Sequence, residues 1–178
     1  MTGGIRASRL RAVDAAYDAE PWSDFAAGMA GAAAALAGLL FVAVSINIQT
    51  ILAQRGSSSR AVEALILLVT PVFLSLVLLI PGQPAVALAV ELFVVAVIAG
   101  TALGWLSRPG SRAHEQPLAS WLGTNVVPAA VVGVAPVVAG IGLLTESLGG
   151  LYWLPAAVAV GLLGGLSNAW VLLVEILR

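Results

Sequence analysis

The sequence predicts an all-α fold, a polytopic bundle of five membrane-spanning helices. The 178-residue chain is 60% hydrophobic and 10% charged, with a mean hydropathy of +1.03. Soluble domains carry about a quarter charged residues, so this composition is typical of a membrane protein. Five apolar stretches are each long enough to cross a bilayer, which takes roughly 20 residues per helix. Turn-rich segments such as "PGQP" separate them.

We expect a tail at residues 1–24 and a single transmembrane domain at residues 25–178. The five spans are predicted at residues 25–51, 62–80, 85–106, 121–144 and 153–176. In the tail, Leu10, Val13 and Tyr17 share one helical face, which predicts a short amphipathic surface helix.

The first stretch is too long for a bilayer. A helix starting at Phe25 would extend about 40 Å, whereas the hydrocarbon core is near 30 Å thick. Its last part, "SINIQTILAQR", is amphipathic, so we expect it to leave the bilayer or to tilt strongly. Asn47 and Gln49 then form either a polar patch at a cytoplasmic mouth of the bundle or ordinary capping and interfacial contacts.

The second and third stretches are only four residues apart, which predicts a tight antiparallel hairpin. The fourth stretch contains Pro128 and Pro136 together with several glycines. Each interior proline removes a backbone hydrogen bond, so this helix should be kinked. Interrupted helices line transport pathways in some membrane proteins, and they are static kinks in others.

Small residues recur at every fourth position, a pattern that lets helix backbones approach closely. The fullest ribbon belongs to the fifth span, and shorter ones belong to the third and the first. In the fifth span the residues are Ala157, Gly161, Gly165 and Ala169, in the third span Ala96, Gly100 and Gly104, and in the first span Ala30, Ala34 and Gly38. The pattern fits packing within one chain and packing between chains.

Arginines predict the orientation. Arg55 and Arg60 lie between the first two spans, Arg108 and Arg112 lie between the third and fourth, and the other two loops carry no basic residue. Basic loops stay in the cytoplasm, so we expect the N-terminus outside and the C-terminus inside. Arginines in the tail oppose this weakly.

Aromatic residues fall near the expected membrane surfaces, as an interfacial belt requires. We expect Trp22, Tyr152 and Trp153 at outer ends and Trp105 and Trp121 at inner ends. Deeper in the fifth span, Trp170 is expected to pack against protein.

Glu91 is the single ionisable residue of the stretch "GQPAVALAVELFVVAVIAG" and lies about 10 Å along its helix. A charge in hydrocarbon costs on the order of 2.5 to 3.5 kcal/mol, so this carboxyl group should be protonated, paired or facing water. Antiparallel pairing sets it roughly opposite Ser75. Glu91 is therefore either a neutral register pin, hydrogen-bonded to Ser75 or a backbone carbonyl, or a group facing an ion pathway. Asn125 and Asn168 are further candidates for such a pathway.

Two other acids lie next to arginines near span ends. Glu63 can pair with Arg60 at i, i+3, and Glu175 similarly precedes Arg178. Both pairs are interpreted as interfacial ion pairs, which are common and weak.

Several function classes are excluded by missing residues. The chain has no Cys and no Lys, and its one His is His114 in a polar loop. Thiolate metal sites, Schiff-base chemistry and bis-His haem ligation therefore lack their residues. We predict no metal site, no cofactor and no enzymatic activity. Because the net charge is −1, nucleic acid is not an expected partner.

Residues 22–91 resemble a group of small, uncharacterised bacterial multi-span membrane proteins. The resemblance lies in "AAAALAGLLFVAVSINIQTIL", "RAVEALILLV", "IPGQP" and Glu91. It implies a bacterial inner-membrane location and the same topology, and it carries no established activity.

Two functional hypotheses follow. In the first, a non-enzymatic bundle acts through lateral self-association or docking on partner membrane proteins. In the second, an oligomer forms an ion channel or proton pathway that uses Glu91.

Overall fold

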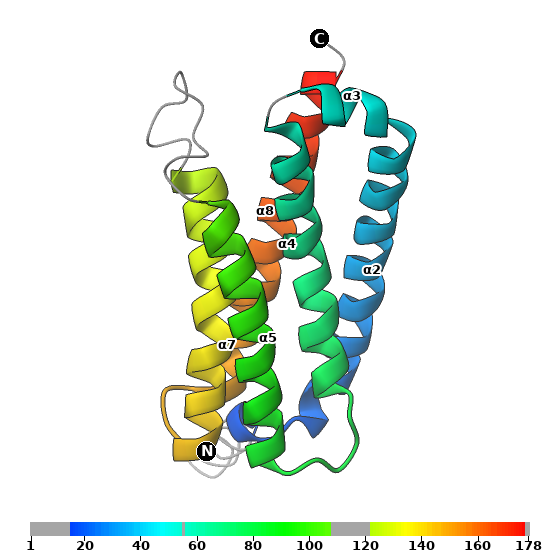
Figure 1. Cartoon of the computed structure of the whole chain (residues 1–178). Coiled ribbons are helices and arrows are strands. Elements are labelled where there is room, and N and C mark those ends of the chain that lie inside the picture. The colour runs from blue at the N-terminus through cyan, green and yellow to red at the C-terminus, as the bar shows by residue number, and fades with distance from the viewer. Residues whose placement is uncertain (1–14, 55, 108–121, 177–178) are drawn as a thin grey trace, which may run out of the picture.

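The computed structural model describes residues 15–54, 56–107 and 122–176. Within these residues the protein is all-helical, and five helices are long and apolar enough to cross a membrane (Figure 1). This confirms the predicted all-α class and a multi-pass membrane protein. The elements in chain order are η1 (Glu20–Trp22), α2 (Ser23–Ile46), α3 (Ile48–Ala53), α4 (Ser57–Leu78), α5 (Ala85–Leu106), η3 (Leu122–Val126), α7 (Val127–Thr145), η4 (Gly150–Tyr152) and α8 (Trp153–Ile176).

The predicted first span is two helices rather than one. Helix α2 ends at Ile46, and α3 continues in a different direction across the end of the bundle (Figure 1). At the junction, Asn47 leaves helical geometry with φ −103° and ψ 16°. Its side-chain Nδ2 donates to the Ala43 carbonyl at 2.9 Å, which caps α2. Of the two interpretations of Asn47, the structure shows capping.

The α4–α5 turn is the predicted tight hairpin. Gly82 adopts φ +66°, a left-handed conformation that glycine enters without steric cost. Gln83 closes the turn, because its Nε2 donates to the Val77 carbonyl at 2.7 Å. We call this side of the molecule the hairpin end and the opposite side the α3 end. The α2 start and the α8 end lie at opposite ends (Figure 1), as five crossings require.

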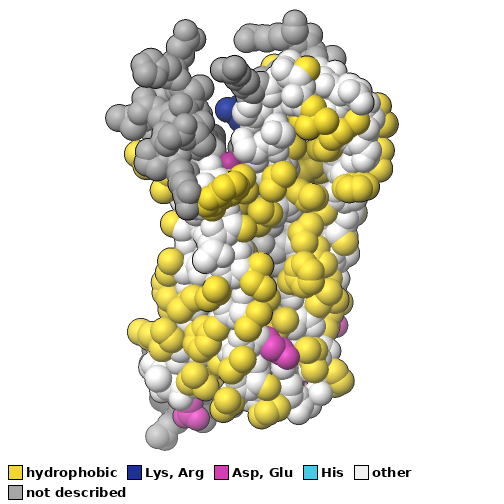
Figure 2. All heavy atoms as spheres, in the orientation of Figure 1, with side chains coloured by type: hydrophobic (Ala, Val, Ile, Leu, Met, Phe, Trp, Pro, Cys, Tyr) yellow, Lys and Arg dark blue, Asp and Glu magenta, His cyan; other side chains and the backbone are white. Residues whose placement is uncertain are grey.

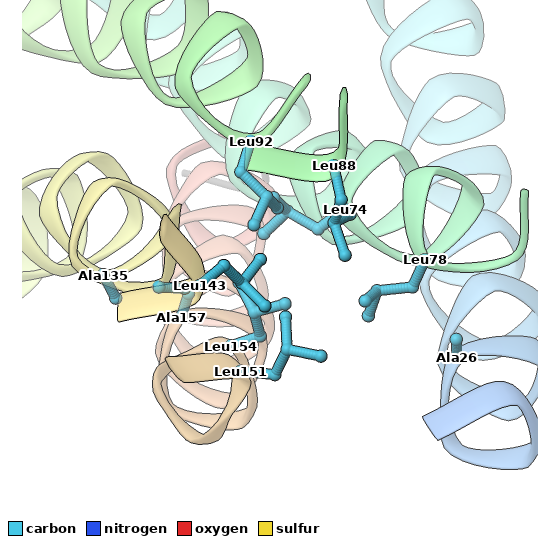
Figure 3. Packing of buried hydrophobic residues seen from close by; sticks show 11 residues of the cluster. Ala26, Leu74, Leu78, Leu88, Leu92, Ala135, Leu143, Leu151, Leu154 and Ala157 are labelled. Atoms are coloured by element: carbon cyan, nitrogen blue, oxygen red, sulfur yellow. The ribbon is translucent and has the colours of Figure 1, made fainter. Parts of the chain in front are cut away.

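Four helices form a closed cycle of contacts, in which α4 packs on α5, α5 on α7, α7 on α8 and α8 on α4. Helix α2 lies outside this cycle and packs mainly on α4 (Figure 1). The largest core cluster lies near the hairpin end and consists of leucines and alanines from α4, α5, α7 and α8, together with Ala26 of α2 and Leu151 of η4 (Figure 3). Leu74, Leu92 and Leu154 are fully buried there.

The small-residue ribbon of α8 packs inside this chain. Ala157, Gly161, Gly165 and Ala169 are all buried. A Cβ added to Gly161 would lie 3.1 Å from the Leu67 carbonyl oxygen, and one added to Gly165 would lie 2.7 Å from Leu68. The ribbon therefore brings α8 against α4. In α5, Gly100 faces Gly133 of α7, whereas Gly104 is exposed and has no atom within 4 Å of an added Cβ.

Aromatic contacts join the tail to the hairpin end. Trp22 meets the Tyr152 ring edge-on with centroids 5.1 Å apart, and its Nε1 donates to the Ala15 carbonyl at 2.6 Å. The described end of the tail is helical at Ala15 to Tyr17, and Ala16 is buried. Leu10 and Val13, the other residues of the expected amphipathic face, lie outside the described residues, as does Trp121.

Trp170 differs from its expectation. Its side chain is 69% exposed on the outer surface of α8, so packing against protein within this chain is wrong for this residue. Trp105 is likewise exposed. More generally, hydrophobic side chains cover much of the visible surface of the bundle (Figure 2), as contact with lipid requires.

Candidate functional site

A carboxylate is buried at the α3 end of the four-helix cycle. Glu63 belongs to the first turns of α4, and its side chain is only 3% exposed. It occupies the inward face of the helix because Leu67, Thr70 and Leu74 follow it at helical spacing and are all buried. A carboxylate in such surroundings requires hydrogen-bond donors or a compensating charge.

Donors for Glu63 come from two other elements. Asn125 Nδ2 donates to Glu63 Oε2 at 3.0 Å, and Ser107 Oγ donates to Oε1 at 3.4 Å. Ser107 is the residue that caps α5, and Asn125 lies in η3. Arg60, one turn earlier in α4, adds an attractive positive charge. The cluster of these four side chains, which we call the Glu63 cluster, therefore ties α4, α5 and the start of α7 together.

The predicted pairing of Glu63 with Arg60 agrees with the attraction between the two charges, but Glu63 is buried rather than exposed at the membrane surface. Surface pairs are screened by water and worth little, whereas this carboxylate is buried and hydrogen-bonded to neutral groups far away in the chain. For the second predicted pair, the Glu175 side chain and Arg178 lie outside the described parts of the structure.

Asn125 reaches Glu63 from a π-helical turn. The turn η3 ends at Val126, just before Pro128. The Pro128 ring cannot accommodate regular helical geometry against the carbonyl four residues earlier, which favours a wider turn at this point. Single π-helical turns are frequent at functional sites because they redirect side chains.

Asn168 is buried in α8 near the same level of the bundle. It is 3% exposed, and its Nδ2 has no hydrogen-bond partner. One turn earlier, Gly164 lies against Pro128 and Leu67. Helical register therefore places Asn168 about one turn nearer the α3 end, at the level of Glu63.

Glu91 lies in the half of α5 nearer the hairpin end. Its side chain is partly buried, and its Oε2 is a buried atom with no hydrogen-bond partner. Ser75 is buried on α4, yet no bond joins it to Glu91 within the described parts of the chain. The expected hydrogen bond from Glu91 to Ser75 is therefore not formed.

The four predicted pathway residues do not meet at one place. Asn125 and Asn168 lie toward the α3 end, whereas Glu91 and Ser75 lie toward the hairpin end. Between them stands a cluster of buried apolar side chains, made of Leu67, Ala99, Leu103 and Val132. A single chain therefore offers no polar route from one group to the other through its described core.

The outward face of α2 is a further notable feature, because little of this helix is buried. Only 17% of the α2 span is buried, against 33% to 56% for the other four. The buried residues of α2 repeat at helical spacing (Ala26, Ala33, Ala37 and Leu40), and α2 packs mainly on α4. The opposite side of the helix carries small residues at similar spacing, and all four are exposed: Gly28, Gly31, Ala35 and Gly38. We call this surface the α2 small face.

No group of three His, Asp or Glu residues lies close enough to hold a metal ion within the described ranges. The Ser167 hydroxyl, beside Asn168 in sequence, donates to the Leu163 carbonyl at 2.7 Å.

Sequence reasoning missed the Glu63 cluster. A signal was present, because Glu63, Leu67, Thr70 and Leu74 form one helical stripe whose other members are mostly apolar. The neighbouring Arg60 offered a simpler explanation for the acid. Ser107 and Asn125 are 44 and 62 residues away from it, beyond the reach of local patterns.

Comparison of this chain with protein-family models, with curated proteins and with solved structures finds no match in any of the three.

Proposed function

We propose that this protein is a non-enzymatic, multi-pass inner-membrane module that works through lateral contacts, with the α2 small face as its contact surface. The arginine-bearing segments favour an N-terminus outside the cytoplasm and a C-terminus inside. The observation that carries the proposal is the α2 small face itself, a row of small residues turned away from the rest of the bundle.

Small residues have a clear use elsewhere in this chain. Gly140, Gly161 and Gly164 each lie where a neighbouring element approaches within 3.1 Å of an added Cβ. In contrast, an added Cβ at Gly28, Gly31 or Gly38 would meet no atom within 4 Å. In membranes, helices associate through close backbone packing, because lipid tails are as apolar as leucine. An exposed row of glycines is therefore suited to another helix rather than to lipid.

The occupant we propose is α2 of a second copy. Both copies insert with the same orientation, so two small faces meet in a parallel pair around a two-fold axis. Such an interface is self-complementary, and two-fold dimers are the commonest oligomers. Helix α2 can present this face without disturbing the four-helix cycle, because its own packing surface is the opposite side.

The alternative function is an ion or proton pathway through Glu91. It would require several copies around a common axis, because the core of one chain between the polar groups is apolar. Glu91→Gln in an oligomer of four or more copies should then change ion flux into vesicles. The α2 proposal expects a dimer and unchanged flux.

The test uses bulky substitutions on two exposed helix faces. Gly31→Ile and Ala35→Ile add bulk to the α2 small face, and Ala159→Ile adds the same bulk to an exposed position of α8. Native mass spectrometry from lipid nanodiscs measures the dimer fraction. We expect the α2 variants to weaken the dimer about tenfold, equivalent to about 1.4 kcal/mol, and Ala159→Ile to match wild type. A monomeric wild type, or a dimer unaffected by the α2 variants, contradicts the proposal.

Disulfide cross-linking locates the interface independently. Because the chain contains no Cys, a single Cys at position 31 or at Leu163 is its only thiol. A disulfide dimer at position 31 and none at position 163 supports the α2 contact. The reverse result places the interface on α8.

A further inference from the structure

A groove of about 450 Å³ runs between α4 and α5 on the outer surface of the bundle. Phe73 and Thr70 line it from α4, and Val94 and Ile98 line it from α5. The Thr70 hydroxyl donates to the Ile66 carbonyl at 2.7 Å, so this polar group is already satisfied. The groove therefore offers an apolar surface about two helical turns long.

Glu91 extends the α5 wall of this groove toward the hairpin end. It precedes Val94 by three residues, Val95 by four and Ile98 by seven, so all four side chains share one face of α5. Its Oε2 is buried and has no partner. In the view of Figure 2, acidic side chains occur among hydrophobic ones in the half nearer the hairpin end.

The described chain has no cation to offer this carboxylate. Arg60 is the single basic side chain in the described ranges, and it belongs to the Glu63 cluster at the other end of α4. At the hairpin end, the Gln83 amide nitrogen is engaged by the Val77 carbonyl. Acidic side chains within membrane spans usually pair with another group or face water, and the described residues supply no cation for Glu91.

We propose that the α4–α5 groove docks a transmembrane helix of a different protein that places an Arg or Lys opposite Glu91. The apolar walls match the side of such a helix, and the carboxylate matches its cation. A lipid tail would fill the groove but would offer the carboxyl group of Glu91 no cation. A second copy of this chain presents no described basic side chain at that depth. The proposal is independent of the α2 small face, which lies on another helix.

The experiment uses synthetic helices as probes in lipid vesicles. One probe is a transmembrane peptide of about twenty Leu and Ala residues with a single central Arg, and the other has Leu in place of that Arg. Both carry a donor dye. The chain has no Lys, so an amine-reactive acceptor dye labels only its N-terminal amine. Energy transfer then reports association of each peptide with the whole protein.

We expect wild type to bind the Arg peptide about tenfold more tightly than the Leu peptide, a difference of about 1.4 kcal/mol. Glu91→Gln should abolish this preference, because it removes the charge and keeps the shape. The exposed acid Glu20 supplies the control, and Glu20→Gln should retain the preference. Absence of an Arg preference in wild type, or its persistence in Glu91→Gln, overturns the proposal.

A second pair of variants tests the groove. Ala102→Phe adds bulk to the groove and should weaken binding of both peptides. Ala159→Phe adds the same bulk to the exposed side of α8 and should leave binding unchanged. If Ala102→Phe binds the Arg peptide as wild type does, the groove is not the docking site.

Discussion

Replacing Gly164 with Ala should destabilise the bundle, although alanine is the better helix former. The added Cβ would lie 2.8 Å from Pro128 Cβ and 3.0 Å from Pro128 Cγ. A proline ring cannot rotate away as a leucine side chain can, so α7 and α8 must separate slightly. Overpacking of this kind costs about 1–3 kcal/mol. The gain in helix propensity offsets up to about 1 kcal/mol, which leaves a net loss of up to about 2 kcal/mol.

A matched glycine supplies the control for this substitution. An added Cβ at Gly104 of α5 meets no atom within 4 Å, so Gly104→Ala keeps only the gain in propensity. Unfolding in mixed micelles, titrated with sodium dodecyl sulfate and followed by circular dichroism, measures the free energy of unfolding of both variants. Gly104→Ala should equal or exceed wild type in stability. Equal stability of the two variants would refute the close approach of α8 to Pro128.

Three further substitutions test other contacts by the same unfolding assay. Asn125→Ala removes a hydrogen bond to the buried Glu63 carboxylate and should cost about 1–2 kcal/mol; in a double-mutant cycle with Glu63→Ala, additive effects would contradict the bond. Asn168→Leu replaces a buried amide whose Nδ2 is unpaired with an apolar side chain of similar size, so it should be neutral or stabilising by about 1 kcal/mol. If Asn168→Leu instead destabilises the protein by more than about 1 kcal/mol, the Asn168 amide has a hydrogen-bond partner. Trp22→Phe removes the bond to the Ala15 carbonyl and should cost about 0.5–1.5 kcal/mol. If proteases cleave the tail of this variant at the same rate as the tail of wild type, the Trp22 bond does not hold the tail on the bundle.

Hydropathy predicted the spans well, because a helix in lipid must be both apolar and about as long as the bilayer is thick. The third span agrees with α5 at both ends. The amphipathic end of the first stretch correctly suggested a change of course, and Asn47 marks the position. The sequence pattern alone could not show whether α2 bends or breaks there.

Contacts between distant residues were beyond sequence reasoning. The Glu63 cluster depends on Ser107 and Asn125, which approach Glu63 only when α5 and α7 have packed. Trp170 appeared suited to the protein interior from its depth, but depth in the membrane says nothing about which side of a helix faces lipid. The ribbon of α8 identified a packing surface, and the structure was needed to show that α4 occupies it.

The arrangement of α2 also affects the order in which this protein assembles. Helix α2 is synthesised before the four helices of the closed cycle, and its packing residues contact mainly α4, the next span to be made. Helix α4 in turn needs α8, the last span, to cover its remaining surface. The first pair can thus form early as an open, two-helix intermediate that persists in the membrane until α8 is inserted. During that interval, a partner that recognises α4 would find surfaces that the finished bundle conceals.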